Sequence, residues 1–173
     1  MSVELRSVET KGVETKGVEP KGVEPRSVET RSADPRVQRI VTGFEQLQRD
    51  DVERLATLYA ADARFKDPFN EVQGVAAVQA VFAHMFVALN EPRFVVHDII
   101  CQGDQCFLSW DFRFRFKRFS TELQTVRGSS HLKLDAQGHI TEHRDYWDAA
   151  EELYEKLPVV ASVMRWLKRR ANS

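Results

Sequence analysis

The spacing of apolar residues predicts two helices at the start of the folded part of the chain. Asp34 followed by Pro35 is a good helix start, because an acceptor side chain caps the helix and proline suits its first position. The apolar residues that follow share one helical face, which ends near Arg49: Val37, Ile40, Val41, Phe44 and Leu47. Asp50 and Asp51 then start a second helix with these buried positions: Val52, Leu55, Leu58 and Tyr59.

A short extended segment and a third helix are expected next. Residues 63–67 should be extended and stop at Pro68, because the residue before a proline avoids helical geometry. Gly74 opens the third helix, whose apolar residues recur at steps of three and four: Val75, Val78, Phe82, Met85, Phe86 and Leu89. This helix is expected to end before residues 90–92, Asn-Glu-Pro.

From residue 93 the apolar period changes to two, which predicts strands. Four strands are expected, at residues 93–102, 105–117, 123–135 and 139–147, and their short links indicate an antiparallel meander. The second strand has two distinct faces: Trp110, Phe112, Phe114 and Phe116 alternate with Asp111, Arg113, Arg115 and Lys117. One face is therefore expected to be aromatic and buried and the other to be solvated.

Helical patterns return after the last strand. Asp148 with Glu151 resembles a capping box for a helix to residue 157, and Pro158 opens a further apolar segment. Four cations near the end suit a helix C-terminus: Arg165, Lys168, Arg169 and Arg170. We expect this extension to pack on its own domain, and binding to an anionic membrane surface is the less favoured alternative.

The N-terminal residues form a tandem repeat of five. From Ser2 to Arg36 each unit offers one small apolar side chain, one acid and one base. Burying so little surface cannot offset a backbone entropy of about 1–2 kcal/mol per residue. We therefore predict a disordered tail at residues 1–35, a pocket domain at 36–148 and a helical extension at 149–173. A docking role for the tail is the alternative.

Composition narrows the class of protein. The 173 residues are 42% hydrophobic and 29% charged, which suits one soluble domain. A net charge of −1 argues against a nucleic-acid partner. No apolar run reaches the roughly 18 residues of a membrane span and no secretory signal is recognisable, so a cytoplasmic location is expected. Cys101 and Cys106 could pair across a hairpin, but two reduced thiols are favoured.

The order of these elements resembles that of the nuclear transport factor 2-like superfamily, and more closely its SnoaL-like and ketosteroid-isomerase-like branch. The resemblance covers about residues 37–147. Its most specific parts are residues 58–68, LYAADARFKDP, with the following Gly74, and residues 143–148, HRDYWD. It implies an α+β cone in which three N-terminal helices pack on a strongly curved antiparallel sheet around a cavity, with C-terminal helices added. Fold alone does not assign the function.

Asp67 is the first candidate catalytic residue. By the resemblance, this acid before a proline matches the general base of the isomerase, and a carboxylate at the rim of an apolar cavity suits that role. The alternative is a turn residue that caps backbone amides. The resemblance also places the two oxyanion donors of the isomerase at Gly43 and Ser130, which lack the required tyrosine and aspartic acid. We therefore do not expect steroid isomerase activity.

The last strand supplies a second candidate group. With a period of two, His143, Asp145 and Trp147 share one face, which the resemblance turns toward the cavity. Histidine titrates near neutrality and a carboxylate fixes its tautomer, so His143 is expected to move protons together with Asp67, and Asp145 to orient it. SnoaL-like cyclases and related dehydratases use such combinations. The alternative is that His143 and Asp145 only hydrogen-bond to each other and Trp147 belongs to the core.

The expected ligand-binding wall is mostly aromatic and apolar: Trp110, Trp147, Phe112, Phe82, Phe86, Met85, Ser130 and Leu132. No metal and no cofactor are expected, because no histidine pair has metal-site spacing and phosphate loops and nucleophile motifs are absent. The favoured hypothesis is a pocket protein for a small, mostly apolar molecule, with isomerase, cyclase or dehydratase chemistry as its enzymatic form. The alternative is a non-catalytic ligand carrier or homodimeric association module of the same fold.

Overall fold

The computed structural model describes residues 32, 34–117 and 122–152. Its elements follow in this order: α1 (Pro35–Glu45), the 3₁₀ helix η2 (Arg49–Thr57), β1 (Tyr59–Lys66), β2 (Glu71–Gln73), α2 (Val75–Ala88), β3 (Leu89–Gln102), β4 (Gln105–Phe116), β5 (Gln124–Leu134), β6 (Ile140–Tyr146) and α3 (Ala149–Glu152). The predicted disordered tail, apart from residues 32, 34 and 35, and most of the predicted C-terminal extension lie outside the described residues.

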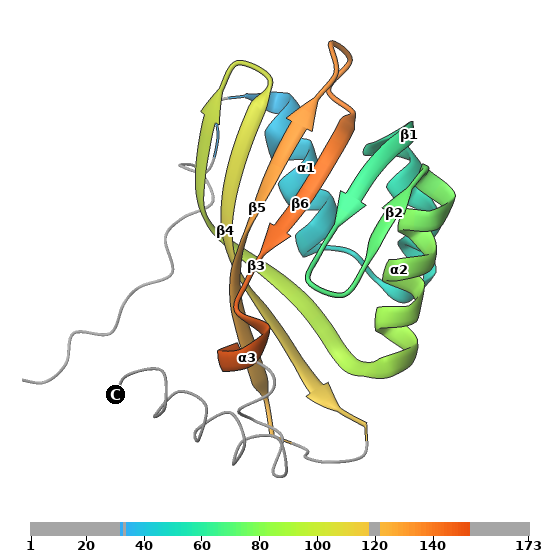
Figure 1. Cartoon of the computed structure of the whole chain (residues 1–173), viewed down its shortest axis with the longest axis vertical. Coiled ribbons are helices and arrows are strands. Elements are labelled where there is room, and N and C mark those ends of the chain that lie inside the picture. The colour runs from blue at the N-terminus through green and yellow to red at the C-terminus, as the bar shows by residue number, and fades with distance from the viewer. Residues whose placement is uncertain (1–31, 33, 118–121, 153–173) are drawn as a thin grey trace, which may run out of the picture.

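The six strands form one mixed sheet in the order β2-β1-β6-β5-β4-β3 (Figure 1). The meander from β3 to β6 is antiparallel, as predicted, whereas β1 joins β6 in parallel and β2 was not predicted. The strong curl into a cone is absent. Strands bend where their register shifts, and such shifts occur in the ladders of β1 with β6, β3 with β4 and β5 with β6. The ladder between β4 and β5 runs without a shift from Gln105 and Lys133 to Phe114 and Gln124. The centre of the sheet is therefore continuous.

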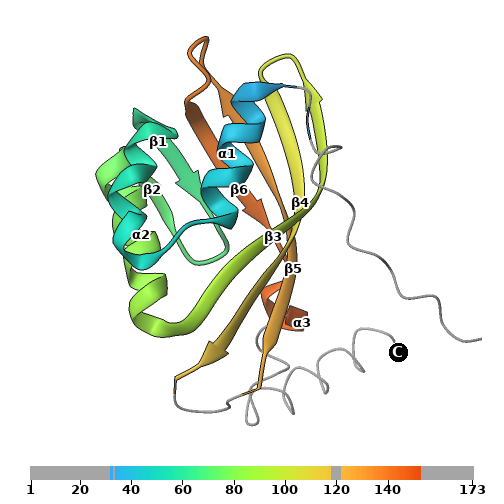
Figure 2. The ribbon, with the colours of Figure 1, turned by 180° about the vertical axis from the view of Figure 1, so that it is seen from behind.

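Helix α1 lies across one face of the sheet (Figure 2). Its predicted start is confirmed, because Oδ1 of Asp34 accepts a hydrogen bond from the amide of Arg36 at 2.9 Å. Its buried residues are also those predicted: Val37, Ile40, Val41 and Phe44. Helix α2 packs against η2, β1 and β3. Helices and sheet together enclose an apolar core between them.

The second predicted helix is a 3₁₀ helix that ends earlier than expected. Its buried Val52 and Leu55, with Leu58 directly after it, are three residues apart, which matches three residues per turn. Tyr59 does not belong to this helix and instead opens β1, where it pairs with Ile140 of β6. Strand β1 is correspondingly longer than the predicted residues 63–67.

The third helix ends before residues 90–92, as predicted, but β3 begins at Leu89 and not at the predicted residue 93. Strand β3 lies at the edge of the sheet, where Pro92 is tolerated although it has no amide hydrogen to donate. The register with β4 shifts between Asn90 and Arg93, and Glu91 has a φ of 51°. The polar triplet is thus a bulge inside a strand rather than a loop.

The part of the chain after β6 begins as predicted. Oδ1 of Asp148 accepts hydrogen bonds from the amides of Ala150 at 2.9 Å and Glu151 at 3.2 Å, so it caps α3. Helix α3 covers Ala149–Glu152, and the rest of the helix predicted to residue 157 lies outside the described residues. Within all the residues that the structure describes, no helix is long and apolar enough to cross a bilayer.

Candidate functional site

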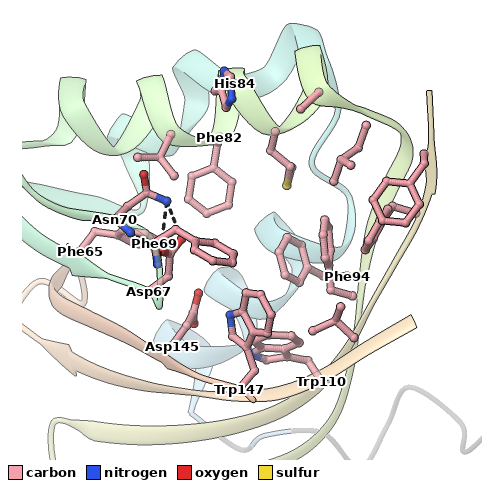
Figure 3. A pocket seen from close by; sticks show the side chains of 18 residues that line it. Phe65, Asp67, Phe69, Asn70, Phe82, His84, Phe94, Trp110, Asp145 and Trp147 are labelled. Carbon is pink, nitrogen blue, oxygen red and sulfur yellow. Dashed lines mark hydrogen bonds between the residues drawn. The ribbon is translucent and has the colours of Figure 1, made fainter. Parts of the chain in front are cut away.

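A cavity of about 330 Å³ lies between α2, the turn after β1 and the inner face of β3 to β6. This volume is within the range of about 300–1,000 Å³ that is typical of small-molecule sites. Nine aromatic side chains line it: Phe65, Phe69, Phe82, Phe94, Trp110, Phe112, Phe114, Phe116 and Trp147. Figure 3 shows Trp110, Trp147 and Asp145 on one wall, with Phe82 and His84 of α2 opposite.

Five of the eight predicted wall residues line this cavity: Trp110, Trp147, Phe112, Phe82 and Met85. Phe86 and Leu132 pack in or against the core instead, and Ser130 is buried behind the wall. Helix α2 is apolar on most of its circumference, so its spacing alone could not tell which side faces the cavity. The predicted aromatic face of β4 does face inward, and it supplies four of the nine rings.

Asp145 is held in the cavity wall through one of its two carboxylate oxygens. Nε2 of His143 lies 2.8 Å from Oδ1 of Asp145, and Oγ of Ser130 donates to the same oxygen at 2.5 Å. The other oxygen, Oδ2, has no hydrogen-bond partner within the described part of the chain. The side chain is 13% exposed and points into the cavity (Figure 3).

A buried chain of donors stands behind Asp145. Nε1 of Trp110 donates to Oγ of Ser130 at 2.8 Å, and the hydroxyl of Tyr59 lies 2.6 Å from Nδ1 of His143. Burial raises the pKa of Tyr59, and the charge of Asp145 raises it further, so the phenol keeps its proton. Because a buried hydroxyl needs an acceptor, Tyr59 donates to Nδ1. His143 therefore carries its hydrogen on Nε2 and donates it to Asp145.

His143 lies deeper than the sequence suggested. It is 4% exposed, it does not line the main cavity, and its ring packs against Phe44, Tyr59 and Phe65. Strand β1 covers it, since Phe65 is its partner in the parallel pairing with β6. The structure thus brings His143 and Asp145 together as expected, but it places Asp145 in the wall of the cavity and His143 behind it.

Asp67 lines the cavity as part of a turn. Its Oδ1 accepts hydrogen bonds from the amides of Phe69 at 2.6 Å and Asn70 at 2.5 Å, and Nδ2 of Asn70 lies 2.9 Å from Oδ2. The carboxylate closes the connection between β1 and β2, which corresponds to the capping alternative. Within the described ranges it makes no hydrogen bond to His143 or Asp145, so it stands apart from the donor chain.

Three residues around the site were missed by sequence reasoning. Tyr59 was placed in a helix, Asn70 had no assigned role, and Phe94 was treated only as part of a strand. Phe94 and Val96 are two residues apart and therefore share one face of β3, and this spacing could have indicated an inward face. Tyr59 and Asn70 had no comparable signal, because their partners depend on the parallel pairing of β1 and on the turn after it.

The comparison with known families decides the classification. The family model of the SnoaL-like domain matches residues 37–143. The chain belongs to the SnoaL-like family. This confirms the resemblance stated from the residues. The SnoaL-like match includes the cavity residues from Phe65 to Val126 and extends to His143, and the cavity residues Asp145 and Trp147 follow directly after it. No curated protein matches the sequence.

Solved structures share the fold of this SnoaL-like chain at low sequence identity. A protein with a ketosteroid isomerase-like fold from Catenulispora acidiphila, in complex with trimethylamine, has 16% identity and a TM-score of 0.61, covering 70% of this chain and 92% of that one. A proposed SnoaL-like polyketide cyclase from Shewanella putrefaciens has 19% identity and a TM-score of 0.59, covering 70% and 98%. An epoxide hydrolase from M. tuberculosis has 13% identity and a TM-score of 0.57, covering 77% and 89%.

Proposed function

We propose that this SnoaL-like domain binds a small, mostly apolar molecule in the cavity and moves a proton on it, with Asp145 as the acid–base group. The observation that carries the proposal is the fixed orientation of this carboxylate. Oδ1 is held by His143 and Ser130, while Oδ2 faces the cavity. A base that is held in one orientation loses less entropy in the reaction than a free one.

The surrounding residues act by positioning Asp145. His143 and Ser130 hold Oδ1, and Tyr59 and Trp110 hold them in turn. In this proposal His143 positions the base instead of moving the proton, and Asp67 shapes the turn that borders the cavity. Relatives of the same fold that are described as a cyclase and an epoxide hydrolase support small-molecule chemistry as the general class.

The simplest reaction for this arrangement begins at a carbon next to a carbonyl group. Oδ2 of Asp145 removes the proton, and the electron pair of the C–H bond moves onto the carbonyl oxygen as an enolate. If the substrate also has a β,γ double bond, this enolate is a dienolate. The protonated carboxylic acid then returns the proton to the γ carbon while the C=O bond re-forms, and the double bond moves into conjugation with the carbonyl. The aromatic wall limits access of water to the intermediate.

Deuterium exchange tests this proposal without a known substrate. Enolisable ketones and aromatic polyketides are incubated in D₂O with the full chain, and C–H exchange is followed by NMR. We expect Asp145→Asn to slow exchange by about 10²- to 10⁴-fold. Glu142→Gln is the matched control, because Glu142 is a carboxylate of the same strand that pairs with Lys133 on the surface. Equal exchange by wild type and Asp145→Asn would refute the proposal.

A non-catalytic ligand carrier is the second candidate. It is favoured by Asp67, because this second carboxylate of the cavity is already occupied by hydrogen bonds of its own turn. A bound ligand with no exchange or turnover in any panel would support the carrier. Both candidates accommodate a homodimer, and sedimentation at micromolar concentration measures whether one forms.

A further inference from the structure

The charged residues that line the cavity are both acidic. Asp67 and Asp145 are the carboxylates, Asn70 and His84 are the other polar residues, and the remaining lining is apolar. No lysine or arginine of the described ranges lines the cavity. A concave apolar site with carboxylates and no cation concentrates negative potential. The negative electrostatic potential of the cavity is therefore unfavourable for an anionic ligand.

The cations beside the cavity are engaged on its outer side. Lys66 and Arg144 line a shallow surface groove that shares Asp67 and Asp145 with the cavity. Lys66 forms an ion pair with Glu71. The guanidinium of Arg144 lies over the ring of Tyr146, 5.0 Å from its centroid. Neither cation lines the aromatic cavity itself.

The charge of Asp145 is not cancelled by its own partners. Both groups that hold Oδ1 are neutral, since Ser130 donates a hydroxyl hydrogen and His143 donates Nε2–H while Nδ1 accepts from Tyr59. Oδ2 remains without a partner in the described part and faces the cavity. A carboxylate that is only 13% exposed and half-satisfied is stabilised by a positive ligand group.

The aromatic wall favours the same class of ligand. The faces of phenyl and indole rings are negative and attract alkylated ammonium groups, and several rings around one cation form the cage known from quaternary ammonium recognition. Phe94 and Phe112 stack at a centroid distance of 4.7 Å, and Trp110 meets Phe94 edge-on at 5.7 Å. The inner wall thus offers closely spaced rings near the side of Asp145.

We propose that the ligand of this cavity is a compact organic cation, a tertiary or quaternary ammonium with apolar substituents. The inference rests on the proposed function and names the substrate class for the same site. Alkyl groups fill the apolar volume, and the ring faces with Asp145 balance the charge. An anion of the same shape meets two carboxylates and no counter-ion from the described residues.

Three probes of one shape test this class by titration of tryptophan fluorescence, since Trp110 and Trp147 line the cavity. They are benzyltrimethylammonium, its uncharged isostere neopentylbenzene, and the anion 2,2-dimethyl-3-phenylpropanoate. For the wild-type full chain we expect the cation to bind at least about tenfold more tightly than the uncharged probe and the anion to bind most weakly. Asp145→Asn removes this preference, and Glu142→Gln retains it.

A second variant guards against misfolding of Asp145→Asn. Phe112→Leu keeps the wall apolar but removes one ring, so it weakens binding of the cation more than binding of the uncharged probe. Equal wild-type affinity for cation and uncharged probe, or tighter binding of the anion, overturns the proposed ligand class and leaves the acid–base function standing. Binding of none of the three overturns the ligand class, and the acid–base function then falls only if deuterium exchange is also absent.

Discussion

The hydroxyl of Tyr59 lies 2.6 Å from Nδ1 of His143, although the two residues are 84 positions apart in the chain. The parallel pairing of β1 with β6 brings them together in the core, where both are buried. This hydrogen bond fixes the tautomer of His143 and, through Nε2, the orientation of Asp145. The geometry of the proposed acid–base group therefore depends on a residue that does not line the cavity.

Tyr59→Phe is expected to lower the free energy of unfolding by about 1–3 kcal/mol, because Nδ1 of His143 is left buried without a donor. Chemical denaturation followed by circular dichroism measures this change. Tyr146→Phe is the control, since Tyr146 is 46% exposed and its ring can still stack under Arg144. Equal stability of the two variants would contradict the assigned hydrogen bond.

The stability of the fold is expected to decrease in alkaline solution through Tyr59. Burial, with the charge of Asp145, raises the pKa of Tyr59 well above its ordinary value. The unfolded chain therefore releases this proton from about pH 10 upward while the folded chain retains it. Stability from this group is complete below pH 10 and is lost above it. The free energy of unfolding, measured between pH 8 and 11, should therefore fall less with pH for Tyr59→Phe than for wild type. The same pH dependence in both proteins would contradict this.

Gly128 allows Trp110 to lie against the backbone of β5. The two residues are opposite each other in the sheet, and a Cβ at position 128 would lie 2.4 Å from Cη2 of the indole. Gly128→Ala is therefore expected to displace the indole, to cost about 1–3 kcal/mol and to shift tryptophan emission. Ser129→Ala, one residue further on the same strand, is the control. Unchanged emission in Gly128→Ala would show that Trp110 does not occupy this place.

The two roles considered for Asp67 predict different effects of substitutions at this position. As a turn residue, Asp67→Ala loses the acceptor of two amides and about 1 kcal/mol of stability, whereas Asp67→Asn keeps an acceptor oxygen. Deuterium exchange by Asp67→Asn should then stay within about threefold of wild type, far less than a lost general base. Thermal unfolding and the exchange assay measure both. A stable Asp67→Asn variant that has lost exchange would restore Asp67 as the base.

Cys101 and Cys106 are expected to react very differently with alkylating agents. They are partners across the β3–β4 hairpin with their Sγ atoms 2.8 Å apart, and both are free thiols. Burial, assisted by the hydrogen bond with Cys101, raises the pKa of Cys106 to about 12. At pH 8 iodoacetamide should label exposed Cys101 and spare Cys106, because the thiolate is the reactive form. Peptide mass mapping locates the label, and Cys101→Ser is the control, in which no cysteine should be labelled. Label on Cys106 in either protein would contradict this prediction.

The elements with strong periodicity could be predicted from the sequence. The apolar face of α1, the cap at Asp34 and the alternation along β4 are local patterns, and each follows from the geometry of a helix or strand. The 3₁₀ form of η2 and the bulge before Arg93 were missed, because they depend on packing and on the edge position of β3. Polar residues such as those at positions 90–92 occur both in bulges and in loops, so their presence does not distinguish the two structures.

The sequence by itself determined the family, the inward aromatic face of β4 and the shared face of His143, Asp145 and Trp147, because a period of two sets which side chains lie together. Tertiary structure alone decided that Asp145 and Trp147 line the cavity and that His143 does not. The parallel pairing of β1 with β6 covers His143 and supplies Tyr59, while the turn after β1 occupies Asp67. Asp145 is left facing the cavity. How deeply each of these side chains is buried depends on contacts between residues far apart in the chain, and local sequence patterns contain no information on such contacts.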